Sequence, residues 1–292
     1  MTATNDNEND NMRNPVIATI LGIAVAGACL GSTAAHAATK DLVEFEKMTW
    51  VEVKDAIAAG RTMALIYTGG VEQRGPQNAN GGHNLIGHAT VDSIARKLGN
   101  AIYFPVLPFT PNNASAELPG TIGITDELLG ALLERLTDQA AVMGFKNVIL
   151  MGDHGGGQPT VYAAVAKKMN DKYSPQGIHV YYCDRVYTAA SDDFEAYMAK
   201  QGLPPDLHGG ISDTSEMMYL DNDGTWVRKD LLKTAVGTPV VDGKPVKGPN
   251  TPNNGIMGDA RKSSVALGKK YMDMKIEYAV KQIREMIGGA AH

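Results

Sequence analysis

Cysteine is scarce in this chain, which has two among its 292 residues. Cys29 lies in an amino-terminal segment that we expect to be removed, so residues 38–292 keep only Cys183. One cysteine excludes an internal disulfide even in an oxidising compartment. Cys183 ends the β-like run IHVYYC, a position typical of a buried structural cysteine. Lipidation at Cys29 is disfavoured because the preceding AGA lacks the usual leucine.

No apolar run is long enough to cross a bilayer. The longest, Val16–Leu30, has about 15 residues where roughly 20 are needed. It follows a basic residue and precedes Ala-His-Ala at 35–37, so residues 1–37 are predicted to be a secretory signal peptide. We therefore expect a periplasmic or secreted protein with no membrane attachment after cleavage, an uncleaved anchor being the alternative. Met12 is an alternative start, since the acidic lead before it is unusual for a signal.

Basic clusters interleaved with aromatics are also lacking. The net charge is −5 and aromatic residues make up 6% of the chain, so nucleic-acid binding is disfavoured. No internal repeat or disordered linker divides residues 38–292, which are long enough to bury a sizeable core. The segment 237–258 is rich in Pro, Gly and Asn, which indicates a long surface loop or a β-hairpin around Asp242-Gly243.

Short apolar runs alternate with stretches of helical periodicity. Buried strands are predicted within 63–70, 101–109, 146–157 and 177–184, and helices over 85–99, 125–144, 158–173 and 258–288. This alternation predicts a single three-layer α/β/α domain at 38–292 with a central, mainly parallel sheet. In such sheets the site lies outside the carboxyl ends of the strands, so the loops after the strands should carry the chemistry.

Two of those loops are rich in ligand-type residues. The first supplies Glu72 and His83, with His88 five residues further on, and the second supplies His154 before three glycines. Two histidines and a carboxylate form a plausible divalent metal set. The alternative interpretation of each histidine is a loop residue that forms hydrogen bonds and binds no metal. A phosphate-binding turn is also considered for DHGGG, but it lacks the Lys and Ser/Thr of a P-loop.

A third cluster, LHGGISDTSEMMYL, spans 207–220. His208 before two glycines is hard to explain by packing and is a candidate general acid or base. The TSE segment is predicted to begin a helix, with Asp213 or Thr214 as its cap. A role of Asp213 in the site is the alternative.

The order of these clusters resembles that of the creatininase family of metal hydrolases. The segments that carry the resemblance are GGVEQRGP (69–76), GGH (81–83), SAELPGTIGIT (115–125), GDHGGGQ (152–158), HGGISDTS (208–215) and GDARKSSVALG (258–268). Each segment is degenerate, but together they are collinear over nearly all of 38–292. The resemblance implies an α/β fold, a zinc or manganese centre, and a homo-oligomer, often a hexamer.

Carried over by position, the resemblance places metal ligands at Glu72 and His154 and the metal-bridging position at His83. It places the catalytic histidine at His208 and the acid that precedes the family's Thr-Ser at Asp213.

This sequence also departs from the family pattern. Arg74 and Gly156 stand where two-metal members supply a histidine and a glutamate, His83 replaces an aspartate, and Ile211 replaces a glutamate. The missing ligands are those of one of the two metals. We therefore expect one ion per subunit, held by Glu72, His83 and His154, with the guanidinium of Arg74 in place of the second ion.

These assignments predict a metal-dependent hydrolase of a small cyclic amide or amidine, or of a lactone. The site residues would be His208, Arg74 and Asp213 as catalytic groups, Glu72, His83 and His154 as metal ligands, and Glu117, Asp153 and Glu216 as substrate-binding groups. Specificity is expected to depend on Asn112, Asn113, Glu117, Tyr187 and the 237–258 loop. The alternatives are a non-catalytic descendant that binds a small metabolite and an oxygen-activating centre with the same ligand types.

Overall fold

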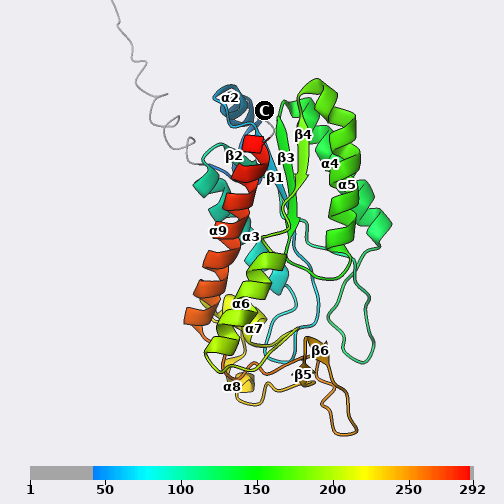
Figure 1. The fold of residues 1–292 in the computed structure, drawn as a ribbon, viewed down its shortest axis with the longest axis vertical. Helices are drawn as coiled ribbons and strands as arrows, with labels where there is room; N and C mark the ends of the chain where they lie inside the picture. The colour runs from blue at the N-terminus through cyan, green and yellow to red at the C-terminus, as the bar shows by residue number, and fades with distance from the viewer. Residues whose placement is uncertain (1–41, 290–292) are drawn as a thin grey trace, which may run out of the picture.

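The computed structural model describes residues 42–289, so the predicted signal peptide at 1–37 lies outside the described residues. At its centre is a parallel sheet of four strands in the order β2-β1-β3-β4 (Figure 1). Its strands are β1 (Met63–Thr68), β2 (Ala101–Tyr103), β3 (Asn147–Gly152) and β4 (His179–Tyr182). All six residues of β1 are buried, as expected for a parallel strand covered on both faces.

The side chains of β1 alternate between two cores. Leu65 and Tyr67 pack in the core that contains residues of α3 (Gly82–Leu98) and α9 (Val265–Gly289). Ala64 and Ile66 pack in the core formed with α4 (Asp126–Met143) and α5 (Gln158–Tyr173). The predicted three-layer α/β/α architecture with a parallel sheet is confirmed, with the two helix layers visible on either side of the sheet in Figure 1.

The ends of α4 follow the local sequence as predicted. The Thr125 hydroxyl accepts a hydrogen bond from the Leu128 amide at 3.2 Å, and Gly144 ends the helix with φ of 104°. The predicted start of the last helix at Gly258 is wrong. Gly258 has φ of 127°, and α9 begins at Val265, where the hydroxyl of Ser264 accepts from the Leu267 amide.

The predicted strand at 101–109 is shorter than expected. β2 ends at Tyr103 because Pro105 and Pro108 have no amide hydrogen to donate to a ladder. The chain nevertheless stays beside β1, since the Leu107 amide donates to the Tyr67 carbonyl at 3.0 Å.

The remaining elements lie at the edges of these layers. They are η1 (Phe45–Lys47), α2 (Trp50–Ala58), η2 (Ser174–Gln176), α6 (Thr188–Lys200), α7 (Ile211–Leu220), α8 (Lys229–Leu232), β5 (Val240–Val241) and β6 (Lys244–Pro245). β5 and β6 form the hairpin that was one of two readings of 237–258, with Asp242 and Gly243 at φ of 50° and 69°. Among residues 42–289, no helix combines the length and hydropathy of a membrane span.

Candidate metal centre

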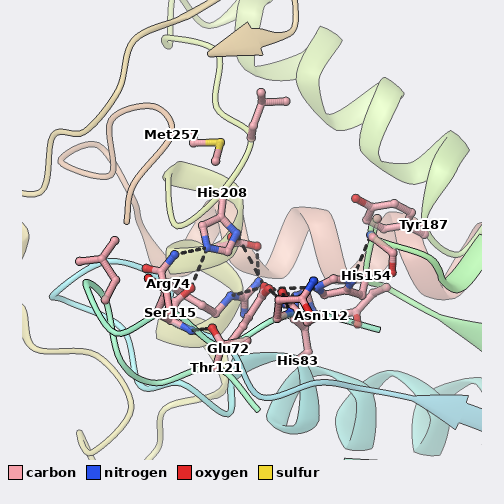
Figure 2. Close-up of a pocket in the computed structure, with 18 residues that line it drawn as sticks. Glu72, Arg74, His83, Asn112, Ser115, Thr121, His154, Tyr187, His208 and Met257 are labelled. Atoms are coloured by element: carbon pink, nitrogen blue, oxygen red, sulfur yellow. Dashed lines mark hydrogen bonds and ion pairs between the residues drawn. The ribbon is translucent and has the colours of Figure 1, made fainter. Parts of the chain in front are cut away.

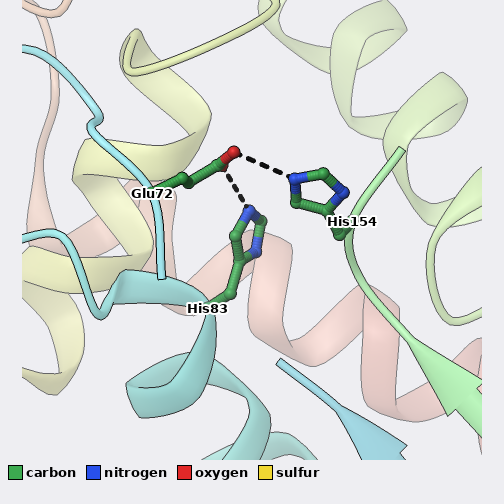
Figure 3. A group of neighbouring side chains, drawn as sticks. All are labelled: Glu72, His83 and His154. Carbon is green, nitrogen blue, oxygen red and sulfur yellow. Dashed lines mark hydrogen bonds and ion pairs between the residues drawn. The ribbon is translucent and has the colours of Figure 1, made fainter. Parts of the chain in front are cut away.

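Three side chains from two strand ends meet in one place (Figure 3). Glu72 follows β1, His83 lies in the first turn of α3, and His154 follows β3. β1 and β3 are neighbours, paired in register from Met63–Asn147 to Thr68–Gly152, so their carboxyl ends deliver these loops to the same point. The carboxylate oxygens of Glu72 lie 2.9 Å from Nε2 of His83 and 2.9 Å from Nε2 of His154.

The chemistry of this cluster fits a divalent metal. One ligand atom from each of Glu72, His83 and His154 lies within 4.8 Å of the other two. Ligands bonded tetrahedrally at about 2.0–2.2 Å stand roughly 3.4 Å apart, so small side-chain shifts would admit an ion. The two nitrogens and one oxygen are ligand types that suit zinc and manganese. Three protein ligands leave coordination positions for water or substrate.

Asp153 holds His83 from behind. Its Oδ1 lies 3.1 Å from Nδ1 of His83, so Nδ1–H can donate to this carboxylate, and Nε2 is the ring nitrogen that faces Glu72. Burial and the charge of Arg74 lower the pKa of His83, but Asp153 and Glu72 outweigh them and raise it to about 9. Burial favours a raised pKa for Asp153, yet the positive charges of His83 and Lys275 lower it.

Glu72 is the common partner of this cluster. It also accepts a hydrogen bond from Nδ2 of Asn112 at 2.8 Å. Burial would raise the pKa of Glu72, but hydrogen bonds from His154 and His83 and the charge of Arg74 hold it well below its usual range. Nδ1 of His154, the ring nitrogen that faces away from Glu72, contacts the backbone of Gly156: it lies 3.0 Å from the amide, which donates to it, and 3.2 Å from the carbonyl oxygen.

Arg74 is enclosed beside the cluster, with 1% of its side chain exposed. Its Nη2 lies 2.5 Å from Oδ1 of Asp213, and its Nε lies 3.9 Å from Oε1 of Glu72. Gly82 makes room for it, because a Cβ at that position would stand 2.2 Å from Nη1 of Arg74. A permanent positive charge therefore lies next to the candidate ligands.

Asp213 does not cap a helix, so the predicted helix start at TSE is wrong. α7 begins at Ile211, which places Asp213 and Thr214 inside the helix. The second oxygen of Asp213 instead accepts from the Gly209 amide at 2.6 Å, while Asp206 accepts from the Ser212 amide at 2.8 Å. Asp213 thus ties the first turn of α7 to Arg74.

His208 lies above the cluster (Figure 2). Its Nε2 lies 2.7 Å from the carbonyl oxygen of Gln73, a contact in which the ring donates, and its Nδ1 lies 3.7 Å from Oε1 of Glu72. Gln73 Nε2 is also 3.3 Å away, but the shorter carbonyl contact fixes the proton on Nε2. The backbone of His208 pairs with that of Met257, at the end of the 237–258 loop.

A cavity of about 430 Å³ joins these groups. Its lining contains Glu72, Arg74, His83, Asn112, Asn113, Asp153, His154, Tyr187, His208, Asp213 and Met257, and also Gln73, Ser115, Leu118, Thr121, Gly155, Gly156 and Leu207.

Two residues assigned to substrate binding lie outside this lining. Glu117 is exposed and accepts from Asn253 at 3.3 Å. Glu216 is 1% exposed and bonds Lys275 at 2.8 Å. His88 is exposed on α3, away from the ligand set.

Sequence reasoning missed Lys275, which is buried beneath the site on α9. The signal for it was a charged residue within the stripe of apolar residues formed by Tyr271, Met272 and Ile276. Gln73 was also missed, since its contribution is a backbone carbonyl that no side-chain pattern reveals.

The model of the creatininase family, described as creatinine amidohydrolase, matches residues 46–283. The chain belongs to the creatininase family. A creatinine amidohydrolase from Pseudomonas putida is 22% identical over an alignment of 253 residues, which covers 82% of this chain and 95% of that protein. Members of the family are metal-dependent amidohydrolases, and solved creatininases carry manganese or zinc.

Solved creatininases share the fold. A manganese creatininase superposes with a TM-score of 0.67 at 20% identity, covering 84% of this chain and 98% of that one. A creatininase mutant complexed with creatine gives 0.68 at 19% identity over the same shares. A putative creatinine amidohydrolase from Bacteroides fragilis gives 0.63 at 18% identity, covering 85% and 96%.

Proposed function

We propose that this chain is a metal-dependent hydrolase of a small cyclic amide or amidine, or of a lactone, with one zinc or manganese ion per subunit. The observation that carries the proposal is the cluster of Glu72, His83 and His154 at one end of a polar cavity, with their ligand atoms within 4.8 Å of one another. Such an ion supplies a polarised carbonyl and a water of lowered pKa. The family's amidohydrolase chemistry supports the reaction class.

Arg74 supplies the charge that argues for a single ion. Its guanidinium stands 3.9 Å from Glu72, where two-metal members carry a further histidine. Within the described residues, its Nε has no hydrogen-bond partner. This nitrogen is buried, so the N–H would donate to the oxygen on which negative charge develops only after a small shift of the guanidinium towards the cavity. Asp213 fixes the guanidinium from the opposite side at 2.5 Å.

His208 is proposed to move the proton. Because Nε2–H donates to the Gln73 carbonyl, Nδ1 is the nitrogen left to accept a proton and to pass it to the leaving nitrogen or oxygen. Nδ1 lies 3.7 Å from the Glu72 carboxylate, so this transfer would occur beside the ligand set. Asn112, Asn113 and Tyr187 line the same cavity and are proposed to set substrate shape.

Export and assembly complete the proposal. The composition of residues 1–37 supports a periplasmic or secreted protein, and the family resemblance supports a homo-oligomer such as a hexamer. Mass measurement of the exported chain tests the cleavage, and light scattering tests the assembly.

Metal analysis by mass spectrometry of protein purified without chelator tests the metal proposal, followed by hydrolysis assays on cyclic amides, amidines and lactones with and without chelator. One ion per subunit and chelator-sensitive hydrolysis are expected. Two tightly bound ions would overturn the one-ion centre. One ion with binding but no turnover across the panel would favour the non-catalytic metabolite binder.

A further inference from the structure

Behind His83 lies a buried chain of charged groups that the proposed reaction does not use. His83 Nδ1 lies 3.1 Å from Oδ1 of Asp153, and Oδ2 of Asp153 lies 3.5 Å from Nζ of Lys275. Nζ also donates to Oε2 of Glu216 at 2.8 Å. The side chains of Asp153, Glu216 and Lys275 are at most 3% exposed. Four elements or their ends thus meet here: the start of α3, the end of β3, α7 and α9.

Lys275 is the cation that the outer oxygen of Asp153 faces most directly. Within the described residues, Oδ2 of Asp153 has no hydrogen-bond partner, so the ammonium at 3.5 Å is its closest polar restraint. The ammonium itself is restrained by Glu216 and by the ring of Tyr271, whose centroid is 4.4 Å from Nζ. The position of Lys275 is therefore fixed from two sides before it meets Asp153.

The orientation of His83 depends on this arrangement. A ligand histidine needs its second nitrogen held by an acceptor so that the first presents its lone pair to the ion, and loss of such a partner weakens metal binding. Asp153 can hold Nδ1 of His83 only if its carboxylate keeps the rotation that places Oδ1 towards the ring and Oδ2 towards Lys275.

We propose that Lys275 is a positioning residue for the metal centre, which acts through Asp153 to hold His83 in its ligand orientation. The proposal rests on the proposed metal site. It assigns to α9, which contributes no ligand, a part in setting metal affinity.

A purely structural role is the competing explanation. Glu216 is a buried carboxylate, and Lys275 could be present only to neutralise it. Removing the charges of Glu216 and Lys275 together distinguishes the two explanations. Such a variant has no unpaired Glu216 charge, so a purely structural role predicts normal zinc binding. Asp153 has nevertheless lost its cation, so a positioning role predicts weaker zinc binding.

The experiment compares Glu216→Gln with Glu216→Gln/Lys275→Met, using Zn²⁺ titration against a chelating dye and thermal unfolding of the apo protein. Glu216→Gln should bind zinc within threefold of wild type, since Lys275 still faces Asp153. The double variant should unfold within a few degrees of Glu216→Gln yet bind zinc about 10- to 100-fold more weakly. Lys281→Met, on the exposed side of the same helix, is the matched control and should bind as wild type does.

Asp153→Asn closes a double-mutant cycle in the Glu216→Gln background. If Lys275 acts through Asp153, Lys275→Met should cause no further loss of zinc binding once Asp153→Asn is present. Additive losses, or a folded double variant that binds zinc as tightly as Glu216→Gln, would overturn the proposal. Wild type that binds no zinc would instead refute the proposed function.

A measurement on the unmutated protein guards against variants that do not fold. Long-range ¹H–¹⁵N spectra of the zinc-loaded protein should show His83 with its proton on Nδ1. A proton on Nε2 would contradict the arrangement.

Discussion

Nη2 of Arg74 lies 2.5 Å from Oδ1 of Asp213, which joins the loop after β1 to the first turn of α7. Both charges are largely withdrawn from water, with 1% and 18% of their side chains exposed. Burial by itself favours the neutral form of Asp213, but Arg74 and His208 hold its pKa below the usual value. The pair is therefore a structural connection as well as a feature of the candidate site.

Removing one charge of this pair should destabilise the protein strongly. Arg74→Met is expected to lower the free energy of unfolding by about 3–5 kcal/mol, because it leaves the Asp213 carboxylate without its partner. Arg74→Met/Asp213→Asn should recover most of that loss in urea unfolding. Arg96→Met is the control, since it breaks an exposed pair with Asp92 on α3 and should cost less than about 1 kcal/mol. Equal stability of Arg74→Met and wild type would refute this reading.

Removing Glu72 should abolish the proposed metal site. Glu72→Ala deletes the carboxylate that faces both His83 and His154, so we expect zinc affinity to fall at least about 100-fold and hydrolysis to disappear. Isothermal titration calorimetry measures the affinity. Glu117→Ala removes an exposed carboxylate outside the cavity lining and should leave both properties unchanged. Normal zinc binding by Glu72→Ala would show that the ligands have been misassigned.

Replacing His208 should separate chemistry from metal binding. His208→Gln is expected to reduce kcat by about 10²- to 10⁴-fold, because proton transfer is lost, while the zinc content stays the same. The measurement is steady-state kinetics on the best substrate of the panel. His88→Gln, on the exposed side of α3, should be fully active. A loss of zinc together with activity would make His208 a ligand instead.

Asp206 should make stability depend on pH. Burial raises its pKa to about 7 in the folded protein, although the Ser212 amide opposes this, whereas an unfolded Asp titrates near 3.9. Between these values the folded state binds more protons, so the free energy of unfolding falls as pH rises from about 4 to about 7. The contribution has a slope of up to ~1.4 kcal/mol per pH unit.

Asp206→Asn should flatten this dependence. Urea unfolding at pH 5 and pH 7 is expected to show a smaller loss of stability for the variant than for wild type. Burial also raises the pKa of Glu216 to about 7. Glu216 titrates in both the variant and wild type, so it does not affect the difference between them. The same pH dependence in the two proteins would mean that Asp206 is not protonated in the folded state at pH 5.

The fold was predictable because its signals are local. The run at 63–68 is apolar throughout, and α4 carries its own cap at Thr125 and its terminating Gly144. Errors arose where another segment decides the structure. The start of α7 depends on Asp206, which accepts a hydrogen bond from the Ser212 amide, six residues further along the chain. The sequence prediction looked for the helix cap only at Asp213 and Thr214, so it did not consider Asp206.

The meeting of Glu72, His83 and His154 could be predicted from strand ends, since adjacent parallel strands bring their following loops together. The surroundings of these three candidate ligands could not be predicted. Glu216 looked like a site residue, but whether its carboxylate meets the cavity or Lys275 depends on the packing of α7 against α9, 59 residues apart at this contact. Glu117 lies within a segment that resembles the family, yet its side chain is exposed and contacts Asn253.

The backbone pairing of His208 with Met257 couples the proposed proton transfer by His208 to the shape of the cavity lining at Met257. Met257 lies at the end of the 237–258 segment and lines the cavity, and its amide and carbonyl hold the backbone of the proposed proton carrier. Any insertion near Met257 that retunes what the pocket admits also displaces His208. Grafting this loop between relatives should therefore succeed only when the 206–210 segment is transferred with it.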